Sequence, residues 1–429
     1  MTSNATSPIS RSFLVRCGLR SELINSTALV VCGAAATLGL DMAAHAATYT
    51  EFSILAHGTH PTGINNVAST ENVLFSFNGT DGEAPYAGLL NVKGTLYGTT
   101  NRGGSNGDGT MFSFIPGTGA ETLLYTFGSG TDGANPYAGL IDVRGTLFGA
   151  TYGGGSDGNG TVFSFNLNAG GQTLLYSFGS GTDGENPYAD LVNFNGTLYG
   201  TTEYGGAYGK GTIFSVDPQT GAETVLHSFG SGTDGWAPYA GLINVKGTLY
   251  GTTGVGGGSG CDGGGCGTVF SFNPKTGHEK VLHSFGKGTD GSYVLAGLID
   301  VGGTLYGTTA SGGIYGEGYG TVFSFDPKTR AEEVLHSFGN GSDGQSPFAG
   351  VIDVGGKLYG TTWNGGVYGY GTVYSLDLKA DTEKVLHSFG NGTDGKSPTA
   401  DLIDVKGTLY STTAAGGTYG DGTLFSIVP

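Results

Sequence analysis

Acidic side chains in recurring loops are the first residues of this chain that could carry chemistry. Glu83 and Glu185 directly follow an Asp-Gly pair, Glu203 follows a Gly-Thr-Thr segment, and Glu317 lies in a glycine-rich stretch. Two carboxylates that flank a glycosidic bond are the usual acid and base of glycoside cleavage, so all four are candidate catalytic groups. Solvated loop glutamates are the plainer interpretation, and the sequence favours it for each of them.

Aromatic and polar side chains in the same loops offer a second kind of chemistry. Trp236 follows an Asp-Gly pair, while Arg102, Tyr204, Trp363 and Asn364 follow the recurring Leu-Tyr-Gly-Thr-Thr segment. Flat rings beside polar groups can stack on sugar rings while bonding their hydroxyls, and an arginine can neutralise a uronate. Packing within the loops is the alternative. Because both tryptophans of the chain fall here, the pattern favours a carbohydrate ligand.

The aspartate of the Asp-Gly pair marks a repeated unit. It recurs at spacings of 51, 51, 51, 56, 53 and 51 residues, as Asp81, Asp132, Asp183, Asp234, Asp290, Asp343 and Asp394. Such a period is typical of a solenoid, a propeller or an array. Because every copy carries the aspartate, we interpret it as a turn-former whose following glycine supplies a positive φ. Calcium or ligand binding is the alternative, and we predict no metal and no cofactor.

The repeat predicts four short strands per copy. In the third copy the β-type segments are 187–193, 196–202, 211–216 and 223–229, separated by turn residues. Joined up and down, they form a four-stranded antiparallel sheet with apolar residues on both faces, which neighbouring copies must cover. We therefore predict an all-β, seven-bladed β-propeller over residues 71–429. An open β-solenoid is the alternative.

The two ends of the repeat region predict a closed ring. Residues 73–77 resemble a fourth strand, whereas the region stops at residues 423–427, which resemble a third strand. Each end lacks what the other supplies, so the N-terminal strand should complete the last blade and remove the exposed edges.

The N-terminus reads as an export signal. Arg11, Arg16 and Arg20 precede an apolar run over residues 28–40, and Ala44-His45-Ala46 fits a small-residue cleavage site. We assign residues 1–46 to a signal peptide, with a membrane anchor as the alternative, and residues 47–70 to a lead segment without a role. We expect no membrane span in the mature chain, because thirteen apolar residues are too few.

Charge and cysteine content narrow the partners. The net charge is −17, and it becomes −18 without the three arginines and two acidic residues of 1–46. A strongly acidic surface repels phosphate backbones, so we expect no nucleic-acid partner. Cys261 and Cys266 sit in the repeat with the longest spacing, where we predict a disulfide across an enlarged loop. A metal site on this cysteine pair is the alternative.

The recurring Gly-Thr-Asp-Gly, Gly-Thr-Leu-Tyr-Gly-Thr-Thr and Gly-Gly-x-x-Gly-x-Gly-Thr segments resemble the bacterial choice-of-anchor tandem repeat GloVer proteins over nearly all of residues 71–427. The resemblance implies an exported protein, often with a C-terminal anchoring tail, and implies no activity. This sequence ends at Pro429 directly after its final strand, which favours a secreted or periplasmic protein over an anchored one.

These observations predict an exported propeller that binds a glycan, or another neutral or cationic ligand, on the rim formed by its long loops. We expect a monomer. A glycoside hydrolase or polysaccharide lyase using rim carboxylates is the second interpretation, and a structural or adhesive envelope protein is the third. The sequence favours a binding protein over an enzyme.

Overall fold

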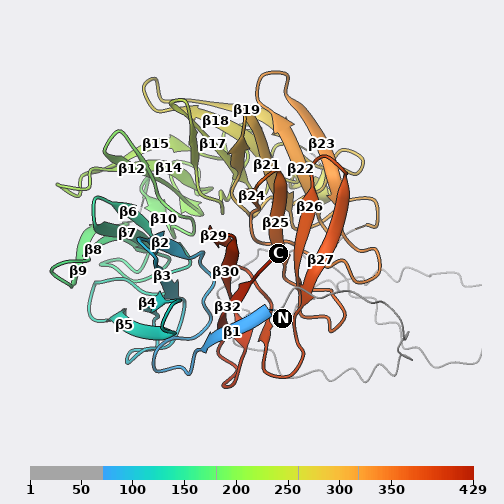
Figure 1. Ribbon diagram of the computed structural model, residues 1–429. Helices are drawn as coiled ribbons and strands as arrows, with labels where there is room; N and C mark the ends of the chain where they lie inside the picture. The colour runs from blue at the N-terminus through green and yellow to red at the C-terminus, as the bar shows by residue number, and fades with distance from the viewer. Residues whose placement is uncertain (1–70, 180, 259, 317) are drawn as a thin grey trace, which may run out of the picture. The chain divides into compact units, whose positions relative to one another are not determined.

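Residues 71–429, apart from 180, 259 and 317, form seven four-stranded antiparallel sheets in a computed structural model. The sheets are arranged as the blades of a β-propeller, which confirms the predicted fold class (Figure 1). The signal peptide, the lead segment and Glu317 lie outside the described residues. The described part contains no helix long and apolar enough to cross a membrane.

Each blade contributes four strands, numbered from the axis outward. Blade 1 contains β2 (Leu90–Val92), β3 (Thr95–Thr100), β4 (Thr110–Ile115) and β5 (Ala120–Thr126). Blade 2 contains β6 (Ile141–Val143), β7 (Thr146–Thr151), β8 (Thr161–Asn166) and β9 (Gln172–Ser177). Blade 3 contains β11 (Val192–Phe194), β12 (Thr197–Thr202), β14 (Thr212–Val216) and β15 (Glu223–Ser228). Blade 4 contains β16 (Ile243–Val245), β17 (Thr248–Thr253), β18 (Thr268–Asn273) and β19 (His278–Ser284).

The remaining blades repeat the pattern. Blade 5 contains β20 (Ile299–Val301), β21 (Thr304–Thr309), β22 (Thr321–Asp326) and β23 (Ala331–Ser337). Blade 6 contains β24 (Ile352–Val354), β25 (Lys357–Thr362), β26 (Thr372–Asp377) and β27 (Thr382–Ser388). Blade 7 contains β29 (Ile403–Val405), β30 (Thr408–Thr413), β32 (Thr423–Ile427) and β1 (Glu71–Ser76). Two short ladders pair β10 (Gly184–Glu185) with β13 (Tyr204–Gly205), and β28 (Gly395–Lys396) with β31 (Ala415–Gly416). One 3₁₀ turn, η1, spans Cys261–Gly263.

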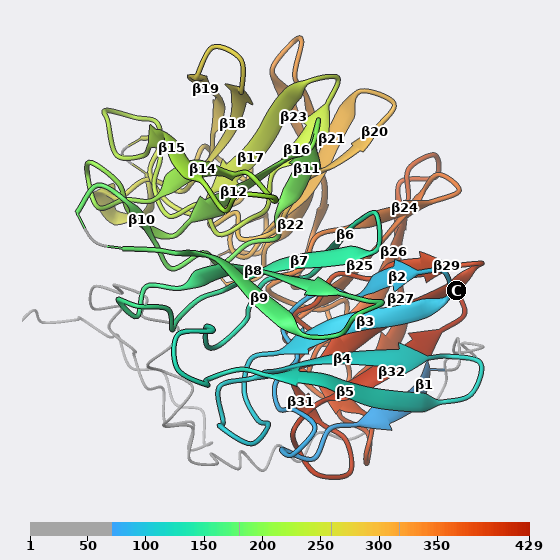
Figure 2. The ribbon, with the colours of Figure 1, turned by 90° about the vertical axis from the view of Figure 1, so that its left-hand side faces the viewer.

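The ring closes as the sequence predicts. Strand β1 pairs with β32 in antiparallel register, with Glu71 opposite Ile427, so the two ends of the repeat region share blade 7. In Figure 1 the blue β1 lies beside the red β32, and Figure 2 shows the same pairing from the side. The Thr412 hydroxyl of blade 7 also donates to the Pro85 carbonyl of blade 1, 3.0 Å away.

The innermost strand is much shorter than predicted. Residues 187–191 were expected to be part of a strand, but β11 begins only at Val192. Pro187 has no N–H to donate to a ladder. The equivalent segment of blade 4 is instead held by the neighbouring blade, because the Thr201 hydroxyl donates to the Ala240 carbonyl. The approach to the axis is therefore fixed by contacts between blades.

An aromatic pair fills each interface between consecutive blades, which we call a blade junction. Phe178, after β9, meets Phe214 of β14 edge to face, with ring centroids 5.0 Å apart and both side chains fully buried. The same pair recurs at all seven junctions, with Tyr374 replacing phenylalanine once. The core is thus divided into seven equivalent clusters between sheets, and each blade is stabilised by its neighbours.

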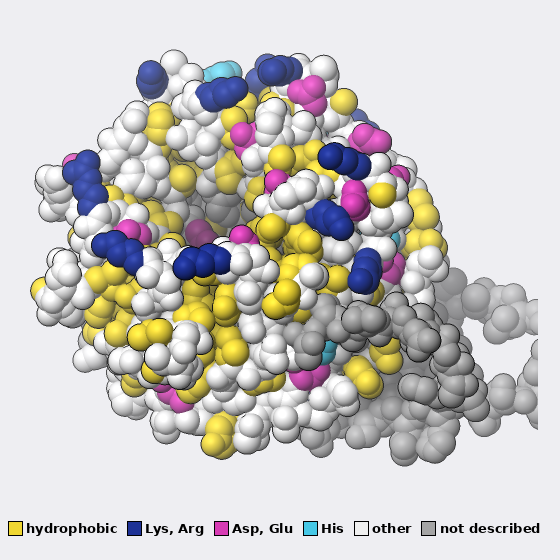
Figure 3. Space-filling model, in the orientation of Figure 1, with side chains coloured by type: hydrophobic (Ala, Val, Ile, Leu, Met, Phe, Trp, Pro, Cys, Tyr) yellow, Lys and Arg dark blue, Asp and Glu magenta, His cyan; other side chains and the backbone are white. Residues whose placement is uncertain are grey.

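The two faces of the propeller differ in their loops. The first and second strands of each blade are joined by a tight turn, as at Lys93 and Gly94, which both have positive φ. The Asn91 side chain accepts the Gly94 N–H, which fits a type I′ hairpin. Figure 3 views this short-hairpin face, where Lys and Arg side chains surround a central hollow. The opposite face carries the long glycine-rich loops.

Candidate functional site at the axial mouth

The two sets of variable loop residues pair with each other on the long-loop face. In every blade the residue after Asp-Gly lies opposite the second residue after the Thr-Thr segment. The seven pairs are Glu83–Arg102, Ala134–Gly153, Glu185–Tyr204, Trp236–Val255, Ser292–Ser311, Gln345–Asn364 and Lys396–Ala415. These short ladders form the rim on which the sequence placed its candidate ligand-binding residues.

The two tryptophans have different surroundings. Trp236 in blade 4 lies beneath the Lys210 ammonium, whose nitrogen is 3.9 Å from the ring centroid. Trp363 in blade 6 packs against Phe348, with centroids 4.8 Å apart. Phe348 lies one residue after the proline that approaches the axis, so Trp363 is turned inward and Trp236 belongs to the rim.

A cluster of tyrosines lines the axis at the level of the long loops, and we call this region the axial mouth. Tyr86, Tyr137 and Tyr188 come from blades 1, 2 and 3 and stack in sequence, with centroid distances of 5.4 and 4.7 Å. Tyr239 of blade 4 meets Tyr188 at 5.6 Å, and Tyr152 contacts Tyr137 edge to face. Side chains of four successive blades can meet in this way only where the blades converge.

The aromatic wall is confined to one side of the mouth. The position of the four stacked tyrosines is occupied in blades 5, 6 and 7 by Leu295, Phe348 and Thr399. Trp363 stands on that side, and the matching positions of the adjacent blades hold only Ala310 and Ala414. The sevenfold fold therefore carries an asymmetric opening, with a tyrosine wall facing one tryptophan.

Polar groups accompany the rings. Glu203 is 3 % exposed, and its carboxylate accepts a hydrogen bond of 2.8 Å from the Tyr239 hydroxyl. Burial raises the pKa of Tyr137 to about 12, and burial with the nearby Glu203 charge raises the pKa of Tyr239 further. These hydroxyls stay protonated at physiological pH and can donate hydrogen bonds to a ligand. Asn101 is buried beside them, and its amide nitrogen has no partner.

Two aspartates lie deeper along the axis. Asp190 and Asp401 each accept a backbone N–H from the preceding blade, from Gly139 at 2.5 Å and from Gly350 at 2.6 Å. Both side chains are exposed to the axial space, yet protein surrounds them on all sides. Burial, reinforced by the Asp401 charge, raises the pKa of Asp190 to about 6. Because blades 3 and 7 are not neighbours, this mutual influence places the pair at the axis.

Sequence comparison between repeats held the signal for these residues, although our sequence analysis did not use it. The position of Asp190 and Asp401 is glycine in the other five copies, and the position of Tyr188 is tyrosine in four consecutive copies. The substitutions could have been found by aligning the repeats. Their meeting across the ring depends on which part of the short inner strand faces the axis.

The catalytic candidates from the sequence are dispersed. Glu203 lies at the axial mouth, whereas Glu83 and Glu185 lie in the rim ladders opposite Arg102 and Tyr204. Among the described candidates, Glu203 is therefore the one near the tyrosine cluster.

The motif aspartates hold the loops between blades. Each of the seven accepts at least one backbone N–H; Asp132, for example, accepts that of Gly128 at 3.1 Å. In blades with a histidine on the outer strand, the second carboxylate oxygen faces that histidine, as His227 Nε2 faces Asp234 Oδ2 at 3.2 Å. Tyrosine hydroxyls take this place for Asp132 and Asp183.

A buried glutamate from the following outer strand completes most of these junctions. Six such glutamates have a carboxylate oxygen that is buried without a hydrogen-bond partner: Glu71, Glu121, Glu223, Glu279, Glu332 and Glu383. Burial raises the pKa of each to about 7, and a nearby motif aspartate raises it further. The sequence analysis predicted no metal, but among the described residues His283, Asp290 and Glu332 bring three potential ligand atoms within 4.8 Å of one another.

The enlarged loop of blade 4 carries a disulfide. Cys261 and Cys266 are bonded, with Cα atoms 5.4 Å apart, and Cys266 is buried in the junction between blades 4 and 5. Both cysteines thus serve the loop and the core.

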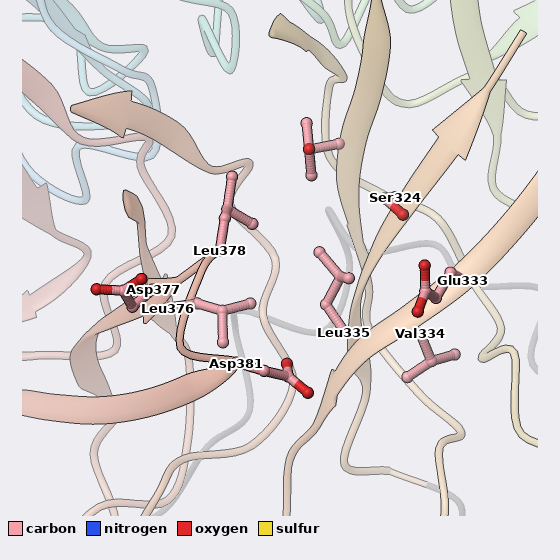
Figure 4. Close-up of a pocket in the computed structure, with 9 residues that line it drawn as sticks. Ser324, Glu333, Val334, Leu335, Leu376, Asp377, Leu378 and Asp381 are labelled. Carbon is pink, nitrogen blue, oxygen red and sulfur yellow. The ribbon is translucent and has the colours of Figure 1, made fainter. Parts of the chain in front are cut away.

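A separate cavity of about 380 Å³ lies between blades 5 and 6 (Figure 4). Leu335 of β23, Leu376 of β26 and the acidic residues Asp377 and Asp381 line it. It sits beside the hairpin of β26 and β27, far along the chain fold from the tyrosines. We place the functional site at the axial mouth, because aromatic and polar groups from several blades converge there.

The fold and the site define a closed seven-bladed β-propeller with an asymmetric axial mouth. The Gloeobacter/Verrucomicrobia repeat model matches residues 62–264 and 259–429, so the chain belongs to this repeat family. This confirms the resemblance found in the repeated motifs. No curated protein matches the chain by sequence.

Several solved structures share the fold. An oligogalacturonate lyase in complex with manganese aligns with a TM-score of 0.55 at 14% identity, covering 84% of this chain and 93% of its own. The extracellular domain of a hybrid two-component system from B. thetaiotaomicron aligns with a TM-score of 0.55 at 14% identity, covering 83% of this chain and 39% of its own. The chain thus spans well under half of that domain. At these identities the likeness shows the fold alone.

Proposed function

We propose that this protein is an exported β-propeller that binds neutral carbohydrate at the axial mouth. The observation that carries the proposal is the wall formed by Tyr86, Tyr137 and Tyr188, which faces Trp363 across the axis. Rings with protonated hydroxyls combine the apolar surface and the hydrogen bonds that a sugar needs.

The charges at the mouth favour a neutral or cationic ligand. Glu203, Asp190 and Asp401 lie at or below the tyrosines, whereas Arg102 lies on the rim near Tyr86. A uronate would meet carboxylates along the axis, and like charges in a partly enclosed space repel strongly. A sugar without a carboxylate avoids this cost and can use the acidic groups as hydrogen-bond acceptors.

Glycan-array screening of the purified chain, followed by calorimetry on the best neutral ligand, tests the proposal. We expect Trp363→Ala and Tyr188→Phe to weaken binding at least tenfold. Trp236→Ala is the matched control, since this tryptophan lies on the rim beneath Lys210, and it should bind as the parent does. Equal affinity in all three variants, or loss of binding only in Trp236→Ala, would place the ligand elsewhere.

A carbohydrate-cleaving enzyme is the second candidate, because buried Glu203 and the raised pKa of Asp190 supply acid and base groups near the same rings. The structurally similar oligogalacturonate lyase shows that this fold can belong to an enzyme named for a carbohydrate. Release of shortened products, abolished by Glu203→Gln, would favour the enzyme. Neither binding nor product release on any glycan would favour a structural or adhesive role.

A further inference from the structure

We infer that the junction between blades 4 and 5 is a binding site for one divalent transition-metal ion of the zinc type, held by His283, Asp290 and Glu332. The imidazole comes from β19, the aspartate from the loop that follows it, and the glutamate from β23 of the next blade. The three ligand atoms lie within 4.8 Å of one another. A metal ion here would tie together two sheets that are otherwise joined by apolar packing.

The orientation of His283 is the observation that distinguishes this junction. Its Nε2 lies 3.3 Å from Asp290 Oδ2, yet the two atoms make no hydrogen bond and Nε2 has no other partner. At the other three histidine junctions the corresponding pair is hydrogen bonded, at 3.1 to 3.2 Å. The side chains of His283 and Asp290 thus approach each other without bonding, as two ligands of a shared ion do.

The glutamate supplies a third unsatisfied atom. Glu332 Oε1 is buried and has no hydrogen-bond partner, and it belongs to the same cluster. A buried polar atom without a partner is costly, and a metal ion would satisfy both orphan atoms at once.

The geometry and the ligand types indicate which ion would bind. Ligands about 2.0 to 2.1 Å from a tetrahedral ion lie about 3.3 Å apart, which matches the separation of Nε2 and Oδ2. One imidazole with two carboxylates suits zinc or manganese, whereas calcium prefers oxygen ligands alone. Three protein ligands leave a coordination position for water.

Asp290 is held in place for this role. Its other oxygen, Oδ1, accepts the N–H groups of Gly286 and Lys287 at 3.0 and 2.8 Å. Two backbone donors fix the carboxylate and leave Oδ2 pointing to His283. At the other histidine junctions a single glycine N–H bonds to the motif aspartate.

Calorimetric titration of the untagged full chain with Zn²⁺, after chelation, tests the inference. We expect one tight site per chain, a higher melting temperature with Zn²⁺, and no comparable effect of Ca²⁺. Glu332→Gln and His283→Tyr should each weaken binding at least tenfold. Both variants should fold, because Gln172 and Tyr176 occupy the equivalent positions at other junctions.

The control is Glu279→Gln at the junction between blades 3 and 4, where His227 is already bonded to Asp234; this variant should bind zinc as the parent does. Cobalt substitution gives a second readout, since one imidazole with carboxylates produces a visible absorption band that Glu332→Gln should abolish. Absence of zinc binding, retention of binding in Glu332→Gln, or equal loss in Glu279→Gln would each overturn the assignment.

Discussion

The axial mouth and the blade junctions use the same sevenfold repeat in different ways. At the junctions the edge-to-face aromatic pair recurs seven times, with centroid distances of 5.0 to 5.2 Å. At the axis the copies differ: tyrosines occupy four blades and Asp190 and Asp401 replace glycine in two. Repetition therefore provides stability, and departures from it provide a single asymmetric site.

Truncating a junction ring should have the largest effect on stability. Phe214 is fully buried against Phe178, so Phe214→Ala should lower the free energy of unfolding by about 3 to 5 kcal/mol. At the axis, Tyr137→Phe removes only a hydroxyl and should cost about 0.5 to 1.5 kcal/mol. Urea unfolding followed by circular dichroism measures both. Equal losses would show that the axis contributes to the fold as much as the junctions do.

The buried glutamates of the junctions should make stability depend on pH. Burial and Asp183 raise the pKa of Glu223 to about 7 in the folded state, above its ordinary value of 4.5. The folded protein thus favours the protonated form, and this stabilisation is complete below about pH 4.5 and is lost as the pH rises through 7. We expect the melting temperature to fall between pH 5 and 8, and to fall less in Glu223→Gln.

The reverse substitution sharpens this prediction. Gln172 is the one glutamine at this register, and its amide donates to the Asp132 carbonyl oxygen. Gln172→Glu should make the decline between pH 5 and 8 steeper. A melting temperature that does not respond to either substitution would show that these carboxylates are solvated.

The smallest effect should come from the one junction that departs from the aromatic pattern. Tyr374 is fully buried, and its hydroxyl has no hydrogen-bond partner. Val351 packs in the same cluster where the other blades have leucine, which leaves room for the extra oxygen. Tyr374→Phe should stabilise the protein by about 1 kcal/mol in urea unfolding. Phe323→Tyr in blade 5, which faces Leu298, should instead destabilise it.

The repeat allowed much of the fold to be predicted. The spacing of Asp81 to Asp394 defined seven blades, and the unmatched strands at residues 73–77 and 423–427 indicated closure. Both inferences depend only on counting copies of a local pattern. The length of the innermost strand was wrong, because residues 187–191 are held by a neighbouring blade, and contacts between copies leave no trace in the repeat itself.

The site was less accessible for the same reason. Trp236 and Trp363 were treated as equivalent loop residues, but the structure turns one toward the axis and the other beneath Lys210. The tyrosine wall was hidden because Tyr137 and its equivalents belong to the recurring motif, and recurrence suggested architecture. The bonding state of His283 depends on a side-chain orientation that no spacing can predict.

Closure by β1 also has a consequence for biosynthesis. Its partner β32 lies roughly 350 residues further along the chain, which a ribosome needs roughly 20 to 70 s to add. Blades 1 to 6 can assemble in order during that time, but Glu71 and its neighbours must wait for the final strand. The ring is therefore sealed in one late event, and a nascent chain stalled before blade 7 would display an open edge to its surroundings.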